Sequence, residues 1–476
     1  MSTLVWFRND LRVRDNPALY HARERGPVAA LFCVCAVQWR QHDVGDHRLS
    51  FLLDSLHALH GELAALGIPL EIADTPRFDA VPQAVVNAAR THGARCVAFN
   101  EEYPLNERKR DSHVIRACED AGIRTDVHHA GTILPPGSVL TGNGDPYTVF
   151  TPFRKRWLSL LDRSAQEPLA KPKRQRAAGS GEAARGRVGL GRGLPQTIDG
   201  VARGAVAERF PAGEKEAAAR LQRFLLGPAE RYQTDRDFPA IDGTSTLSPY
   251  LAVGAISARQ CLHAALQANR GRPADGTPGL STWVTELIWR DFYRHVVALF
   301  PHVSRGQGFR TETDALAWRH DPEDLAAWQE GRTGYPLVDA GMRQLNATGW
   351  MHNRLRMITA MFLSKHLLLD WRLGERWFMN KLVDGDFAAN NGGWQWSAST
   401  GTDAAPYFRI FNPYTQARRF DPEGRFIRRW VPELETAPDR SLFDPDKYPV
   451  SGYPRPMVDH REARQRALEA FKSLKT

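Results

Sequence analysis

The most unusual group of polar and aromatic side chains lies in the last quarter of the chain. Asp384 and Asp386 flank a glycine, Asn390 follows one helical turn later, and Trp394 and Trp396 complete the stretch. Two close carboxylates can bind a metal ion, but no histidine or third carboxylate lies at ligand spacing. The sequence therefore predicts no metal site here and leaves an acidic, amide-rich turn beside two indoles.

A second group lies on one predicted helix face within residues 283–295. Glu286, Trp289, Arg290 and Tyr293 recur at i, i+3, i+4 and i+7, so they project from the same side of the helix. A carboxylate, an indole and a guanidinium together can read a base edge, stack on a base and hold a phosphate. A salt-bridged helix with Trp289 in the core is the plainer interpretation of this segment alone.

Two further segments carry residues suited to a nucleotide. The run 243–249 is rich in hydroxyls that can surround a phosphate, although such runs more often form turns and helix caps. In the run 349–357, Asn353 and Met357 lie one helical turn apart. The amide can pair with a pyrimidine edge, and the thioether supplies soft packing.

Residues 1 to about 130 alternate between strand and helix patterns. From Leu49 to Leu66 leucine repeats every three or four residues, and Gly67 follows where a helix should end. Strands that alternate with helices predict a parallel, doubly wound sheet. No Gly-x-Gly-x-x-Gly follows the first strand, which argues against an ordinary dinucleotide site there. The predicted strands are Thr3–Phe7, Val28–Val37, Pro69–Ala73, Cys96–Asn100 and Thr125–His129.

The rest of the chain divides into a linker and a helical region. Residues 163–200 are rich in Gly, Ala and basic side chains, which favours a flexible linker over a nucleic-acid or targeting patch. After residue 205 the periodicity is nearly all helical. We predict an α/β domain over 1–131, an interdomain linker over 132–205 and a large all-α domain over 206–476. The helical pattern is clearest at Glu214–Leu225, Ser257–Gln267, Trp283–Phe300, Leu325–Glu330 and Met351–Leu369.

Composition is typical of a globular protein without a membrane span. Of the 476 residues 42% are hydrophobic and 25% charged, and neither a long apolar run nor a signal-peptide pattern is present. Five cysteines without a Cys-x-x-Cys pair predict a reduced, cytosolic protein. The 63 basic and 54 acidic side chains give a net charge of +9, which suits a nucleic-acid partner, although an arginine-rich composition explains it equally well.

Five segments, in the same order along the chain, carry a family resemblance. Together they resemble the photolyase/cryptochrome family, and within it the bacterial class I cyclobutane pyrimidine dimer photolyases. The resemblance implies FAD in the helical domain and light-driven repair of damaged DNA, in which excited reduced FAD gives one electron to a flipped-out dimer. The segments are Val5–Arg12, Thr244–Ser248, Trp283–His295, Gly349–Met357 and Asp384–Trp396, and the match continues to Tyr453–Arg464.

The resemblance also implies which residues hold the FAD. Asn390 matches the residue opposite flavin N5, and Asp384 and Asp386 match carboxylates that face the isoalloxazine and ribityl groups. Arg356 is the expected partner of Asp384. The expected FAD-binding set is Tyr232, Thr244, Ser245, Thr246, Leu247, Ser248, Trp283, Arg356, Asp384, Gly385, Asp386 and Asn390.

Damaged DNA is the implied partner, bound by two sets of residues. The walls that receive the lesion are expected to be Glu286, Trp289, Asn353, Met357 and Trp396. The positions that hold the strand are expected to be Arg236, Arg290, Arg354 and Gln416. Stacking on aromatic walls suits a flipped base, since each stacked base contributes about 1–3 kcal/mol.

Three tryptophans match a chain that carries electrons from the surface to the flavin. Trp394 is expected innermost, Trp371 between, and Trp318 near solvent. For any one of them, burial in the core is the plainer interpretation. With Asn390 and Glu286, these three tryptophans form the expected catalytic set.

The N-terminal domain is expected to hold an antenna chromophore. His42, Asn106 and Glu107 match residues of a methenyltetrahydrofolate pocket. Where the folate pattern has a Cys-Lys pair, this chain has Ser304 and Arg305. A folate is the first expectation, and a deazaflavin or no antenna stays open.

The expected function is that of a monomeric, cytoplasmic photolyase that acts on pyrimidine dimers. Three other functions compete with it. Asn390 argues against a plant-type cryptochrome, which has an acidic residue there, and no long tail follows the helical region. A (6-4) photolyase is expected to show two histidines where this chain has His352 and Asn353. A plain FAD oxidoreductase fits poorly with the net charge and with ten of the thirteen tryptophans lying beyond residue 280.

Overall fold

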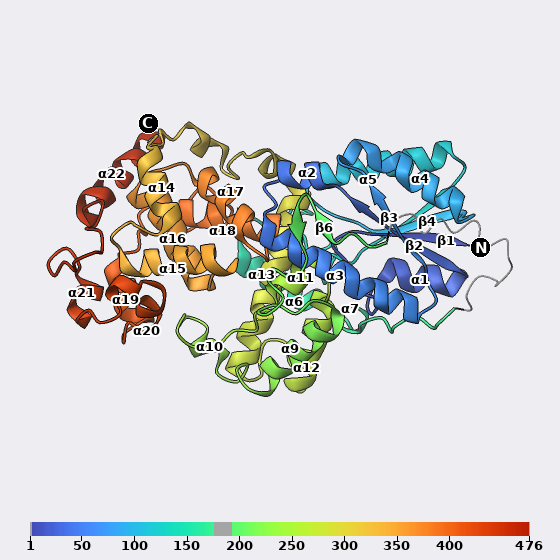
Figure 1. Cartoon of the computed structure of the whole chain (residues 1–476), viewed down its shortest axis with the longest axis horizontal. Coiled ribbons are helices and arrows are strands. Elements are labelled where there is room, and N and C mark those ends of the chain that lie inside the picture. The colour runs from blue at the N-terminus through green and yellow to red at the C-terminus, as the bar shows by residue number, and fades with distance from the viewer. Residues whose placement is uncertain (1, 176–192, 476) are drawn as a thin grey trace.

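The computed structural model describes residues 2–175 and 193–475. The N-terminal part is built on five strands: β1 (Thr3–Phe7), β2 (Val28–Val34), β3 (Leu70–Asp74), β4 (Cys96–Asn100) and β5 (Arg124–His128). They form one parallel sheet in the order β3-β2-β1-β4-β5 (Figure 1). Since the chain runs outward from β1 in both directions, the predicted doubly wound sheet is confirmed.

Helices cover both faces of this sheet. They are α1 (Pro17–Arg25), α2 (Ala36–Gln41), α3 (Asp46–Ala65), α4 (Val81–Thr91) and α5 (Leu105–Asp120). Val5 and Phe7 of β1 pack in the same core as the apolar residues of α1 and α3. Leu4 and Trp6 pack with those of α4 and α5 on the other face. Successive strand residues point to opposite faces, so a strand buried on both sides reads as one continuous apolar run.

Predicted element ends differ from the structure by a few residues. The second strand stops at Val34 and α2 begins at Ala36, although the apolar run continues to Val37. The leucine-rich segment forms α3 as predicted, and Gly67 follows its end with a φ of 71°. This left-handed conformation is one that glycine adopts without a Cβ penalty.

The C-terminal part is largely helical, as predicted. Its helices are α9 (Glu214–Leu226), α10 (Tyr232–Asp235), α11 (Ser248–Val253), α12 (Ala258–Ala268), α13 (Pro278–Leu299), α14 (Pro322–Glu330), α15 (Pro336–Thr348), α16 (Asn353–Met361), α17 (Trp371–Lys381), α18 (Phe387–Ala398), α19 (Pro413–Phe420), α20 (Arg425–Trp430), α21 (Asp439–Phe443) and α22 (His460–Lys472). A separate apolar core joins α14 to α20, with Trp328, Trp371 and Trp394 at its centre. Across residues 2–175 and 193–475, no helix has both the length and the apolar character needed to cross a bilayer.

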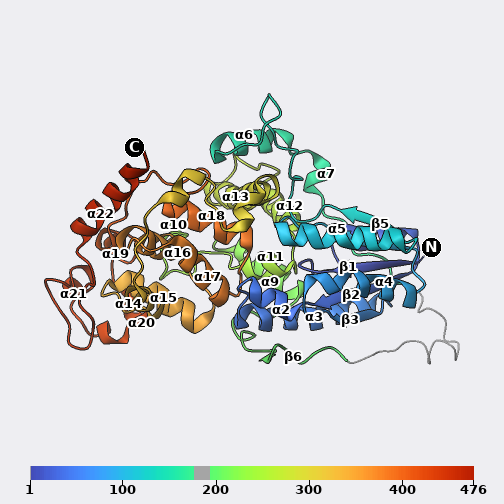
Figure 2. The same cartoon turned by 90° about the horizontal axis from the view of Figure 1, so that it is seen from above.

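The expected linker contains a helix that packs firmly against the C-terminal part. Helix α6 (Phe150–Leu160) lies over α13 (Figure 2). Trp157 is fully buried and its indole donates to Asp291 Oδ2 at 3.0 Å. Only part of the stretch 132–205 is therefore a linker, because α6 belongs to the helical core. It also holds α7 (Arg163–Gln166), β6 (Thr197–Ile198) and β7 (Val201–Ala202), while residues 176–192 of the expected basic linker lie outside the described residues.

Candidate active site

Four helices bring the expected flavin-binding residues close together. Tyr232 lies on α10, Trp283 on α13, Arg356 on α16 and Asn390 on α18. α13 contacts both α10 and α18, and α16 contacts α18. Residues from widely separated segments therefore surround one region of the helical part.

The hydroxyl run 244–248 holds one residue in a costly conformation. Thr246 has a φ of 47°, which a β-branched residue rarely adopts. Arg220 of α9 donates to the Thr246 hydroxyl. The Phe224 ring contacts both Tyr232 and Trp283, with ring centroids 5.6 and 5.0 Å away. Since such strain is usually kept at ligand-binding sites, the run is a better candidate for a binding loop than for a simple helix cap.

Asp384 is a buried carboxylate with one paired and one unpaired oxygen. Arg356 donates to Asp384 Oδ2 at 2.8 Å and to the Met351 carbonyl at 2.9 Å, so the expected ion pair is present. In the described structure Asp384 Oδ1 is buried without a hydrogen-bond partner. An unsatisfied buried acceptor costs about 1–3 kcal/mol, and a ligand donor at this oxygen would remove that cost.

Asp386 is held as an anion by two arginines of α13. Arg294 pairs with Asp386 Oδ2 at 2.5 Å. Burial alone would raise the pKa of Asp386, but the charges of Arg294 and Arg290 outweigh it and hold the pKa below its usual value. Burial and Arg294 lower the pKa of Arg290 to about 10. The three side chains form a compact charge cluster.

Arg290, which was expected to hold the DNA strand, is bound to the main chain of the protein. Its guanidinium donates to the Gly131 carbonyl at 2.8 Å and lines the cavity between the sheet and the helical part. Arg290 thus lies in the charge cluster with Asp386, and its expected role in holding DNA stays a prediction.

Asn390 is oriented by a hydrogen bond to the main chain of α17. Its amide nitrogen donates to the Glu375 carbonyl at 3.0 Å. The Glu375 carboxylate accepts from Asn391 at 2.9 Å, and Asn391 accepts from Gln395 at 2.8 Å. Within the described residues no donor reaches the Asn390 amide oxygen, which is therefore available to a ligand. Burial raises the pKa of Glu375 to about 7, against the opposing hydrogen bond from Asn391.

Glu375→Gln should remove a pH dependence from the stability of the protein. The unfolded chain ionises this carboxyl near its model value of 4.5, whereas the folded chain keeps the proton up to about pH 7. Stability therefore falls as pH rises through that window, by roughly 3 kcal/mol. Thermal unfolding of the variant should show a flatter pH profile and a higher midpoint at about pH 8. Glu435→Gln, at an exposed carboxylate, is the control; parallel profiles for wild type and Glu375→Gln would contradict the assignment.

The residues expected to receive a lesion lie on adjoining helices. Glu286 is ion-paired with Arg236, and burial raises the pKa of Glu286 although Arg236 opposes it. Arg354 pairs with Asp237 at 2.7 Å. Asn353 is exposed, and Trp289, Met357 and Trp396 are partly exposed. Gln416, which is expected to hold the DNA strand, is also partly exposed.

Burial separates Trp318 from the other two tryptophans of the expected electron chain. Trp394 and Trp371 are fully buried, and Trp318 is partly exposed. The Trp394 ring lies so close to Gly374 of α17 that a Cβ there would come within 2.1 Å of it. Trp371 is one turn before Gly374, and Arg319, the residue after Trp318, forms a backbone bridge with Leu369, two residues before Trp371. The order of the three indoles along an electron path, and their redox role, stay predictions.

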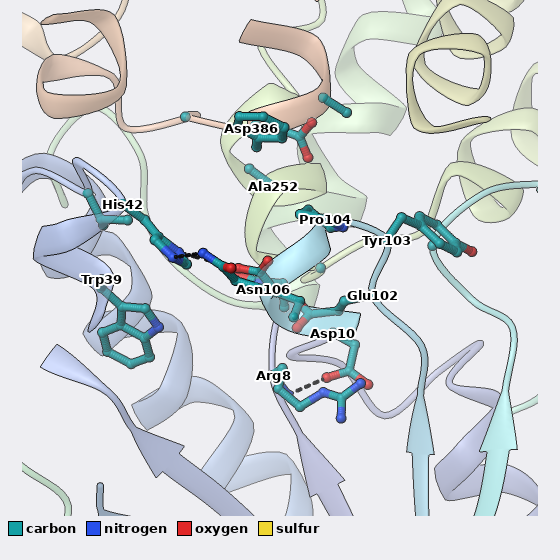
Figure 3. Close-up of a pocket in the computed structure, with 18 of the residues that line it drawn as sticks. Arg8, Asp10, Trp39, His42, Glu102, Tyr103, Pro104, Asn106, Ala252 and Asp386 are labelled. Carbon is teal, nitrogen blue, oxygen red and sulfur yellow. Dashed lines mark hydrogen bonds and ion pairs between the residues drawn. The ribbon is translucent and has the colours of Figure 1, made fainter. Parts of the chain in front are cut away.

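A cavity of about 420 Å³ lies between the sheet and the helical part (Figure 3). It contains all three expected antenna residues: Asn106 Nδ2 lies 3.0 Å from His42 Nε2, and His42 Nδ1 lies 3.4 Å from Glu107. Ser304 lines the same cavity.

Of the expected FAD set, Gly385 and Asp386 reach the helical side of this cavity. Arginines that the sequence analysis did not single out also line it: Arg8, Arg12, Arg48, Arg110 and Arg294.

Comparison with known proteins identifies the family. Residues 3–173 match the family described as DNA photolyase, and residues 283–473 match the FAD binding domain of DNA photolyase. The chain is 46% identical to the deoxyribodipyrimidine photo-lyases of Salmonella typhimurium and Escherichia coli, over 99% of its own length and 98% of theirs. The chain belongs to the DNA photolyase family.

A solved photolyase shares the whole architecture. The crystal structure of a bacterial class III photolyase from Agrobacterium tumefaciens superposes with a TM-score of 0.86 at 35% identity, covering 100% of this chain and 98% of that one. The photolyase resemblance drawn from the sequence and the two-part fold are thus confirmed. The roles of individual residues stay predictions.

Several residues of this photolyase-family site have no local sequence signal. Arg294, Glu375 and Arg220 act through contacts with segments far away in the chain. An ion pair between Arg294 and Asp386 spans 92 positions, so neither periodicity nor motif spacing indicates it. In residues 2–175 and 193–475, no cluster of three or more His, Cys, Asp or Glu side chains could hold a metal ion.

Proposed function

We propose that the protein repairs cyclobutane pyrimidine dimers in DNA with light, using FAD bound in its helical part. The 46% identity over 478 residues to two deoxyribodipyrimidine photo-lyases carries this proposal. The FAD-binding family match over residues 283–473 supports the cofactor. The reaction breaks carbon–carbon bonds, which makes the protein a lyase.

The side chains around the proposed FAD site fit a flavin nucleotide. The unpaired Asp384 Oδ1 offers an acceptor to a ring N–H, and Asn390 offers a second one. The strained loop at Thr246 offers hydroxyl and main-chain donors that suit a diphosphate. In the part of the chain that the structure describes, Asp384 Oδ1 is buried without a protein partner, as expected of a group that a ligand completes.

Protein residues supply position and electrostatics at this site. When bound, reduced FAD supplies one electron to the dimer on excitation by light and recovers it after the ring has opened. Asn390 presents its amide oxygen because the Glu375 carbonyl fixes its amide nitrogen. An amide has no proton to release at neutral pH, so Asn390 accepts a hydrogen bond without becoming an acid. Arg294 forms an ion pair with Asp386 and keeps the Asp386 carboxylate ionised.

We propose that the flipped-out dimer binds between Trp289 and Trp396. Photolyases extrude the damaged nucleotide from the stack, and two unstacked rings need aromatic surfaces to cover them. Glu286 is ion-paired with Arg236, and its carboxylate can accept a hydrogen bond from a pyrimidine N–H. Asn353 offers both a donor and an acceptor, and Met357 packs without a fixed geometry.

The test is light-dependent repair of a defined substrate. Purified protein should show flavin absorption and restore dimer-containing oligothymidine in light but not in darkness. An oligonucleotide with a (6-4) photoproduct, assayed in parallel, should stay unrepaired. Repair of the (6-4) substrate alone would assign the other photolyase activity, and flavin photoreduction without repair of either substrate would favour a cryptochrome-type photoreceptor.

We also propose that the cavity between the two parts holds an antenna chromophore, with methenyltetrahydrofolate as the first candidate. His42, Asn106 and Glu107 gather on its wall, although Ser304 and Arg305 replace the Cys-Lys pair of the folate pattern. Protein purified without denaturation should carry a second, folate-type absorption band, which Glu107→Ala should remove without loss of FAD. A deazaflavin spectrum, or no second band, would contradict the folate assignment.

Arg354→Gln should weaken DNA binding and reduce its dependence on salt. Each lost phosphate contact lowers the slope of log K against log salt by about 0.9 between about 50 and 200 mM. Arg354 is ion-paired with Asp237, which offsets part of its positive charge. The reduction in slope should therefore be at most this large. Fluorescence anisotropy with a dimer-containing duplex measures the slope, with Lys215→Gln on α9 as control. An unchanged slope would remove Arg354 from the DNA contact surface.

A further inference from the structure

One face of Trp289, the expected lesion wall, is covered by another ring of the chain. Phe150, the first residue of α6, stacks on Trp289 with ring centroids 3.5 Å apart and planes 7° apart. Phe150 is only 6% exposed and meets Phe292 edge-on at 5.8 Å. The face of Trp289 that Phe150 covers is therefore closed to a base, and the Tyr293 ring also lies stacked near Trp289, with centroids 5.6 Å and planes 29° apart.

The loop that follows α18 holds Phe150 in place. The Phe150 main-chain N–H donates to Asp403 Oδ2 at 3.2 Å, and the Thr402 hydroxyl donates to the Thr148 carbonyl. Asp403 has a φ of 45°, a left-handed conformation that costs free energy in any residue other than glycine and that Asp and Asn tolerate best. Non-glycine residues kept in this region cluster at functional sites.

The same loop is fastened to the second expected wall, Trp396. The Ala405 N–H donates to the Trp396 carbonyl at 3.2 Å, and the Thr400 N–H donates to the Gln395 carbonyl at 3.0 Å. This short loop is therefore hydrogen-bonded directly to Trp396, and it is linked to Trp289 through Phe150.

We propose that Phe150 is a positioning residue for dimer binding. Phe150 stacks on Trp289, and its main chain is held by Asp403. It thereby fixes the orientation of the Trp289 ring and its position relative to Trp396, the other wall expected to contact the dimer. The inference rests on the proposed function and makes α6, which belongs to the segment between the two parts of the chain, a component of lesion recognition.

The first test compares Phe150→Leu with Phe153→Leu. Both replace a buried ring of α6, but Phe153 contacts Phe292 and His295 rather than Trp289. Binding of dimer-containing and undamaged oligothymidine is measured in the dark on FAD-loaded protein. Phe150→Leu should lower the preference for the dimer roughly two- to tenfold, the range expected for one aromatic pair. Phe153→Leu should leave that preference unchanged.

A double-mutant cycle with Trp289 separates positioning from general loss of structure. Since Phe150 acts through Trp289, Phe150→Leu should have no further effect on dimer preference in a Trp289→Ala background. An equal loss in both backgrounds, or no loss in the wild-type background, would overturn the inference. If wild-type protein itself shows neither dimer preference nor repair, the proposed function fails and this inference with it.

Asp403 supplies an independent pair of variants. Asp403→Gly removes the acceptor for the Phe150 N–H without straining the backbone, because glycine accepts a positive φ. It should lower dimer preference as Phe150→Leu does. Asp403→Asn keeps an acceptor oxygen and tolerates the same φ, so it should restore most of the preference. Equal behaviour of the two Asp403 variants would contradict the proposed fastening of Phe150.

Discussion

Replacing Trp394 by phenylalanine should abolish the light-driven reduction of oxidised FAD and leave dimer repair intact. Phenylalanine preserves an apolar ring against Gly374 but removes the oxidisable indole. Trp394 is expected to be the innermost of three indoles that pass electrons inward from Trp318, a route that reloads the cofactor rather than one that serves the dimer. The two activities should therefore separate in a single variant.

The experiment follows FAD absorption under illumination with an external electron donor. Trp394→Phe should remain oxidised, whereas the same protein reduced chemically beforehand should repair dimers at nearly the wild-type yield. Trp328→Phe is a matched control, since Trp328 is also fully buried and its ring lies 5.9 Å from that of Trp394. Photoreduction that persists in Trp394→Phe would show that the electron enters by another route and that Trp394 serves packing.

Trp289→Ala should weaken dimer binding and leave the FAD content unchanged. Loss of a stacking surface for a flipped base costs about 1–3 kcal/mol, which corresponds to a reduction in affinity of roughly 5- to 150-fold. Trp289 lies three residues from Glu286 on α13, on the side expected to face the lesion, and it is only partly buried. Trp289 also packs against Phe150 and Phe292 of the apolar core, so the FAD content is measured as well, to show that the helical part stays intact.

Two measurements decide whether Trp289 faces the lesion. Dimer affinity is measured in the dark, and FAD is released from the purified variant and quantified. Trp430→Ala, which removes a partly buried indole of α20 from the other apolar core, should change neither value. A Trp289→Ala protein that loses its FAD would show Trp289 to be part of the flavin site, and the proposed lesion pocket would then be misplaced.

Local sequence patterns were sufficient for the architecture. β1 and β4 have the predicted bounds, and the leucines of α3 lie on a helix that ends before Gly67. Strand and helix periodicity depend on residues two to four positions apart, so a short window of sequence contains the information. Helix α6 was not predicted, although its buried positions Phe150, Phe153 and Trp157 follow the i, i+3, i+7 spacing of one helix face.

Motifs in the sequence also located most of the candidate site, because each motif is a run of neighbours. Thr246 and Asp384 were identified in this way, together with the residues around them. What no motif indicated is the strained backbone of Thr246, the unpaired oxygen of Asp384 and the raised pKa of the nearby Glu375. Such properties depend on burial and on partners brought in by other helices.

Only the tertiary structure decided which side chains act together. Arg294 holds Asp386, and Phe150 covers Trp289, across 92 and 139 positions of chain. A helix pattern shows that Trp289 shares a face with Glu286, but not which ring will lie on that face. The pairing depends on how α6 and the loop at Asp403 pack against α13, and packing between distant segments leaves no periodic trace in the sequence.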